Sequence, residues 1–93
     1  MIVHNVLFKL KDPAEVDEAV KVLRSMEGKI EELQHVEVGV DMLHTERSYH
    51  IAFISHFETW DDLKAYRAHP VHKPVIDHMN RVVETAAAVD YEV

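Results

Sequence analysis

Four stretches of the chain combine apolar residues with the two-residue alternation of β-strands. They span residues 2–10, 35–42, 49–57 and 86–93. The first carries apolar side chains on both of its faces, so we expect a central strand that is covered on both sides. His4 lies on the more continuously apolar of these two faces, which makes it a candidate for a specific role.

Two amphipathic stretches between the strands have apolar residues at helical spacing. The first begins at Asp12, a good N-cap in front of a proline, and ends near Gly28. The second begins at Thr59, whose hydroxyl can cap a helix. Pro70 ends it, because the residue before a proline is disfavoured in the helical region. A further helix is expected over residues 71–82.

The order of these elements, β-α-β-β-α-β, predicts one ferredoxin-like α+β domain over residues 1–93. In that arrangement an antiparallel sheet carries its helices on one face. The other face then needs a cover of its own, since the strands over residues 2–10 and 49–57 hold apolar residues on both sides. We therefore expect a homodimer through the sheet face, with Phe53 turned toward the second copy.

Charge and composition exclude several classes of protein. The formal net charge is −7 at pH 7, whereas a nucleic-acid binder needs a basic surface. The chain has no cysteine, which rules out disulfides and thiolate metal sites. No apolar run approaches the roughly 20 residues of a membrane span, and the N-terminal stretch alternates like a strand rather than a signal peptide. We expect a cytoplasmic protein with neither a nucleic-acid nor a membrane partner.

The stretch AYRAHPVHKPVIDH, residues 65–78, holds three of the eight histidines. Its Tyr66, His69 and His72 are a catalytic group, a metal site or the hinge between two helices. The metal site is the weakest interpretation, because Pro70 breaks the helix that would align His69 with His72 and no HExxH motif is present. We expect no metal, and nothing in the composition selects a cofactor.

Several segments resemble the stress-responsive A/B barrel domain family, a group of dimeric α+β barrels. They are HNVLFKLK, EVGVDM, SYHIAFISHFETWDDLKAYRAHPVH and VDYEV, and together with the order of elements they extend the resemblance over nearly the whole chain. The tyrosine followed by His-Pro-x-His is the most specific part. The chain departs from the family pattern at Asp41, where asparagine is expected, and in the turn before Tyr49, which lacks a glycine.

In one branch of that family, which resembles polyketide cyclases, a histidine removes a proton in an intramolecular aldol step. The resemblance implies His72 as this base and Tyr66 as the assisting residue. It implies Asp90, from its place on the last strand, as the partner that orients His72. His4 is similar to a histidine that lines the same cavity. The remaining candidate ligand contacts are Val6, Phe8, Phe53 and His69.

These residue types suit such chemistry. A neutral histidine accepts a proton near pH 7, a carboxylate on its other nitrogen fixes the tautomer, and a tyrosine hydroxyl donates to a developing oxyanion. The same residues are equally compatible with a structural role, in which an Asp–His pair only satisfies two buried polar groups.

Two functions therefore stay open from the sequence. The first is a homodimeric barrel that binds an apolar or aromatic metabolite, with histidine-based proton transfer. The second is a non-enzymatic stress-response or interaction protein with a packed barrel. A cavity of roughly 300 Å³ or more beside His72 would favour the first, and a filled interior would favour the second.

Overall fold

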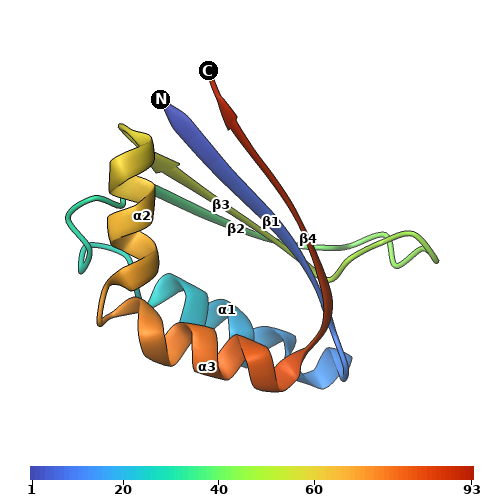
Figure 1. Ribbon diagram of the computed structural model, residues 1–93. Helices are drawn as coiled ribbons and strands as arrows, with labels where there is room; N and C mark the ends of the chain where they lie inside the picture. The colour runs from blue at the N-terminus through green and yellow to red at the C-terminus, as the bar shows by residue number, and fades with distance from the viewer.

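The computed structural model describes all 93 residues and contains four strands and three α-helices. In chain order the elements are β1 (Ile2–Leu10), the short 3-10 helix η1 (Pro13–Glu15), α1 (Val16–Arg24), β2 (His35–Val40), β3 (Ile51–Phe57), α2 (Trp60–Ala68), α3 (His72–Val82) and β4 (Val83–Glu92). The strands form one antiparallel sheet in the order β2-β3-β1-β4. All three α-helices lie on one side of this sheet (Figure 1). The expected ferredoxin-like α+β fold is confirmed.

The capping residues act as the sequence indicates. The Asp12 carboxylate accepts a hydrogen bond from the backbone N–H of Ala14 at 2.9 Å, and the Thr59 hydroxyl accepts one from the backbone N–H of Asp62 at 3.1 Å. Both fill donors that a helix start would otherwise leave unpaired. Gly28 has a φ of 73°, in the left-handed region that glycine adopts at little cost. It lies in the turns that follow α1 rather than directly at the helix end.

The last strand begins earlier than the sequence suggests. Strand β4 starts at Val83, directly after the last residue of α3, whereas the expected start is residue 86. Val83 already has extended backbone angles, with φ −83° and ψ 130°. No glycine or proline marks this change, so the sequence carries no local signal for it.

The hydrophobic core lies between the sheet and the helices. Ile2 on β1 and Phe57 on β3 face each other across the strands, and both are almost completely buried together with Tyr66 of α2. Phe53 belongs to the same core and is 2% exposed. The expectation that Phe53 faces a second copy is therefore wrong. Alternation places it on the helix-covered side of β3, with Phe57.

The opposite side of the sheet carries no helix (Figure 1), and we call it the free face. Pairing between strands assigns to it Val3, Asn5, Leu7 and Lys9 of β1, Ala52, Ile54 and His56 of β3, His35, Glu37 and Gly39 of β2, and Thr85, Ala87, Val89 and Tyr91 of β4. Near its centre the apolar residues Leu7, Ile54 and Val89 surround Asn5. Val89 and Tyr91 are 62% and 41% exposed, so this face offers apolar surface for an interaction.

The helices are all too short and too polar to span a bilayer.

Candidate functional site

The break between α2 and α3 brings Tyr66 and His72 together. Helix α2 ends at Ala68, the next residue His69 has extended backbone angles, and α3 begins two residues after Pro70. The rings of Tyr66 and His72 stack with their centroids 4.1 Å apart and their planes 25° apart. The Nδ1 atom of His72 lies 3.1 Å from the backbone oxygen of Tyr66. Since a carbonyl can only accept, this nitrogen carries the proton when the ring is neutral, and Nε2 is the basic atom.

His4 and Asp90 form the second half of the site. They stand opposite each other in the register of β1 with β4, and the Asp90 carboxylate is hydrogen-bonded to Nδ1 of His4. The His4 ring meets Tyr66 edge-on at a centroid distance of 6.4 Å. The two side chains are 13% and 29% exposed, so the pair is shielded but still reaches the surface.

The sequence suggested a different partner for Asp90. We expected it to hold His72, but its hydrogen bond goes to His4, and His72 bonds to the backbone of Tyr66 instead. The physical reason is the strand register, which places residues 4 and 90 side by side on neighbouring strands. Residues directly opposite in an antiparallel pair are close enough for their side chains to interact.

The other candidate residues are divided between the core and the turn. Val6 and Phe8 are half-buried on the helix side of β1, and Phe53 is buried opposite Val6. The Nδ1 atom of His69 accepts a hydrogen bond from the backbone N–H of Val71 at 3.0 Å. In this structure His69 therefore stabilises the break between the helices.

Two further residues belong to the site and were missed in the sequence. Arg67 follows Tyr66 in the last turn of α2, and its guanidinium lies 3.9 Å from the Asp90 carboxylate. Ser55 is fully buried, and its hydroxyl donates to the backbone oxygen of His4 at 3.4 Å. Arg67 directly follows the tyrosine of the motif in which His-Pro-x-His comes after Tyr66. This position in the sequence was the signal that could have identified Arg67. Ser55 was detectable only as a polar residue on an otherwise apolar strand face.

Burial changes the protonation of two of these groups. It raises the pKa of Tyr66 far above its usual value, although the nearby Arg67 guanidinium acts in the opposite direction. The phenol therefore stays protonated and can donate a hydrogen bond. Burial also lowers the pKa of His72, an effect that backbone hydrogen bonds from the end of α2 partly offset. Charged His4 and Arg67 would lower it further, so His72 is neutral at pH 7.

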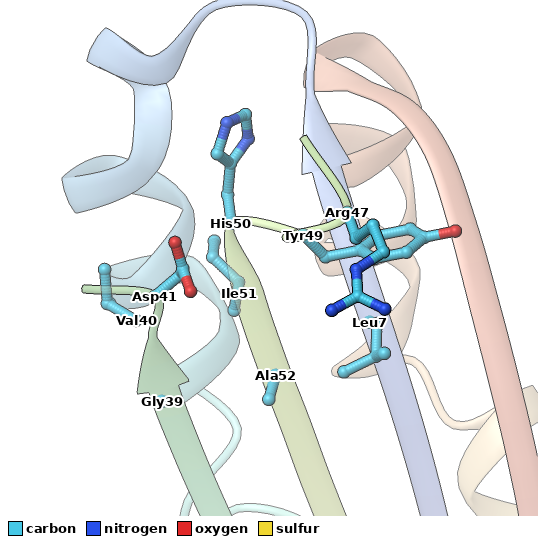
Figure 2. A pocket seen from close by; sticks show the side chains of 9 residues that line it. All are labelled: Leu7, Gly39, Val40, Asp41, Arg47, Tyr49, His50, Ile51 and Ala52. Atoms are coloured by element: carbon cyan, nitrogen blue, oxygen red, sulfur yellow. The ribbon is translucent and has the colours of Figure 1, made fainter. Parts of the chain in front are cut away.

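The hollows of the structure lie away from this cluster. The largest has a volume of about 370 Å³ and is lined by Leu7, Ala52, Arg47, Tyr49 and five other residues. Figure 2 shows it over the ends of β2 and β3, with the Arg47 and Tyr49 side chains beside Leu7. None of the four hollows is lined by His4, Tyr66, His72 or Asp90.

The lowered pKa of His72 makes a prediction about pH. The unfolded chain binds a proton at His72 at a higher pH than the folded chain does, so this group contributes a loss of stability as pH falls below about 6.5. We expect His72→Gln to lose less unfolding free energy than the wild type between about pH 7 and pH 5. Urea denaturation at several pH values measures this. His44→Gln, at an exposed loop histidine, is the control, and a wild-type slope in His72→Gln would contradict the prediction.

Comparison with known proteins gives a family and a set of similar folds. The model of the family described as "Stress responsive A/B Barrel Domain" matches residues 2–93. No curated protein matches the chain in sequence at a significant level. Among solved structures, a dimeric protein of unknown function with a ferredoxin-like fold from Bacteroides fragilis is 34% identical, with a TM-score of 0.78. That alignment covers 99% of this chain and 95% of the other.

Two more distant structures share the fold. A dimeric ferredoxin-like protein of unknown function from Thermobifida fusca is 24% identical, with a TM-score of 0.87 and coverage of 99% and 90% of the two chains. A hydroxynitrile lyase from Passiflora edulis is 14% identical, with a TM-score of 0.85 and coverage of 99% and 92%. At these identities the similarity establishes the fold alone, which hosts many activities.

Proposed function

Because the chain belongs to the stress-responsive A/B barrel domain family, we propose that it is a small homodimeric α+β barrel protein of the cytoplasm that binds an apolar or aromatic metabolite. The ligand binds beside the His4–Asp90 pair, and His4 removes a proton from a carbon next to a carbonyl group. This assigns to His4 the base role that the sequence suggested for His72.

The observation that carries the proposal is the hydrogen bond between Asp90 and Nδ1 of His4. A carboxylate can only accept, so the neutral imidazole carries its proton on Nδ1 and leaves Nε2 as the basic atom. The carboxylate also stabilises the imidazolium that forms when Nε2 takes up a proton. The pair thus has the two properties that a general base needs, a defined tautomer and a compensating charge.

Tyr66 and His72 supply the complementary groups. Tyr66 is 2% exposed, and burial keeps its hydroxyl protonated. It is therefore available to donate to the oxyanion of an enolate. His72 stacks on the Tyr66 ring and bonds to the end of α2, so it holds the ring in place.

An apolar strip next to the pair provides the binding surface. Val6 and Phe8 on β1 stand opposite Ala88 and Ala86 on β4. These two alanines are exposed although they face the helix side of the sheet, since no helix covers β4 there. An apolar or aromatic ligand lying on this strip would reach His4, which is next in line on the same face of β1.

The homodimer is supported by the free face and by the relatives. The free face exposes Val89 and Tyr91 on the same side of the sheet as Leu7 and Ile54, and such apolar surface is typical of a protein–protein interface. The Bacteroides fragilis relative, which is 34% identical, is described as dimeric.

Proton abstraction can be tested without knowledge of the natural substrate. We expect the protein to accelerate the exchange of the α-protons of phenylacetone in D2O, measured by proton NMR. Asp90→Asn and His4→Gln should each reduce the acceleration by about a hundredfold, a typical contribution of a general base. His44→Gln, at an exposed loop, should behave as the wild type. Unchanged exchange in Asp90→Asn would refute the role of the pair.

The packed interior favours the non-enzymatic alternative. No hollow adjoins the stacked Tyr66 and His72 rings, as expected of a cluster whose only role is to stabilise the fold. In that case phenylacetone should cause no chemical-shift changes at His4 or Tyr66. Asp90→Asn and His4→Gln should then lower the melting temperature, and no exchange above the buffer rate should be seen with the wild type.

A further inference from the structure

The Asn5 side chain is an unpaired polar group at the middle of the free face. It stands opposite Ile54 on β3 and Val89 on β4, on one of the two inner strands of the sheet. Its Oδ1 atom is buried and has no hydrogen-bond partner in the chain. A buried polar atom without a partner is destabilising, so its presence among apolar neighbours requires an explanation.

Three other polar residues of the free face, His35, His56 and Glu37, have polar neighbours of their own. His35 and His56 stand opposite each other with ring centroids 4.7 Å apart, and Glu37 lies 3.9 Å from His35. This group sits at the β2 edge of the sheet. Ile54 on β3 stands between Asn5 and Glu37, and Asn5 has no polar residue directly across either neighbouring strand.

We infer that Asn5 pairs with Asn5 of a second copy of this chain and thereby sets the register in which the two free faces meet. The inference rests on the homodimer of the proposed function. In a two-fold symmetric interface, residues close to the axis meet their own copies. An axis near the centre of the free face brings the two Asn5 side chains together.

The chemistry of the amide fits this arrangement. A carboxamide has both donor and acceptor atoms. Two of them can exchange a pair of N–H to oxygen hydrogen bonds across the axis once each side chain rotates its Oδ1 atom, which the chain's own atoms cover in the single copy, toward the partner. A half-turn of the side-chain amide exchanges its oxygen and nitrogen positions, so either atom can face outward. Apolar contacts between Leu7, Ile54 and Val89 tolerate several relative positions of two sheets. A central amide pair disfavours all positions except the one that satisfies it.

Single-cysteine cross-linking tests the contact directly, because the chain has no cysteine of its own. A disulfide forms only where the two Cα atoms come within about 7 Å. We expect Asn5→Cys to give a folded, covalent dimer under mild oxidation. Asn80→Cys, at an exposed position of α3, is the control and should cross-link only at the slow rate of random collisions.

The outcomes separate the pairing from the homodimer itself. A wild-type protein that is monomeric at micromolar concentration overturns both proposals. A dimeric wild type in which Asn5→Cys cross-links no faster than Asn80→Cys overturns the Asn5 pairing alone. The homodimer would then stand with a different axis.

Substitutions that introduce opposite charges at Asn5 test the pairing in a second, independent way. Asn5→Asp and Asn5→Lys should each weaken self-association by at least about a hundredfold, since like charges that face each other across an interface repel. An equimolar mixture of the two should restore the dimer as a mixed species, because opposite charges then face each other. A mixture that stays monomeric overturns the pairing, since residues that lie away from the axis would not meet.

Discussion

Phe53→Asp is expected to leave the chain unfolded at room temperature. Phe53 is 2% exposed in the core between the sheet and the helices, so the new carboxylate would have neither water nor a partner. Truncating a buried phenylalanine costs about 3–5 kcal/mol, and an uncompensated buried charge adds about 3 kcal/mol or more. Together these losses are comparable to the free energy of unfolding of a typical domain, which is roughly 5–15 kcal/mol.

Far-ultraviolet circular dichroism and the spread of amide signals in an NMR spectrum measure the loss of structure. Phe53→Leu is the matched control, because it keeps an apolar side chain at the same position. We expect it to remain folded with a lower midpoint of urea denaturation. A folded Phe53→Asp protein with native amide shifts would show that this side of β3 is not the core.

The order of the elements was predictable from the sequence because three kinds of signal agreed. Alternation marked the strands, helical spacing marked the helices, and Asp12 and Thr59 marked the helix starts with caps that the structure confirms. Which face of β3 the helices cover was not predictable. Both sides of that strand are rich in apolar residues, so alternation separates Phe53 from Ile54 without showing which of them faces the helices.

Only part of the candidate site was predictable. The helix break at Pro70 is visible in the sequence, whereas the register between two strands is not. A helix that must end before Pro70 turns the chain, and the turn places His72 on the ring of Tyr66. The partner of Asp90 depended on the register of β1 with β4, which aligns residues 4 and 90. The strands β1 and β4 lie at opposite ends of the chain. No tight hairpin turn joins them, so no local feature of the sequence fixes their register.

Ile54→Lys is expected to give a folded protein that no longer self-associates. Ile54 lies next to Phe53 but on the free face, between Asn5 on β1 and Glu37 on β2. In the single chain a lysine there would remain in water and stand opposite a carboxylate, a cross-strand pair that adds a few tenths of a kcal/mol. In the homodimer it would bury two ammonium groups near the middle of the interface, which would cost several kcal/mol.

Sedimentation velocity should therefore give about twice 10.8 kDa for the wild type and the single-chain mass for Ile54→Lys. Both proteins should have the same far-ultraviolet circular dichroism spectrum. Ile54→Leu preserves the apolar volume and should remain dimeric, which separates the effect of charge from that of shape. A dimeric Ile54→Lys protein would place the interface elsewhere on the molecule. The contrast with Phe53→Asp follows from alternation: two neighbouring residues on one strand face opposite sides of the sheet, one toward the core and the other toward the free face.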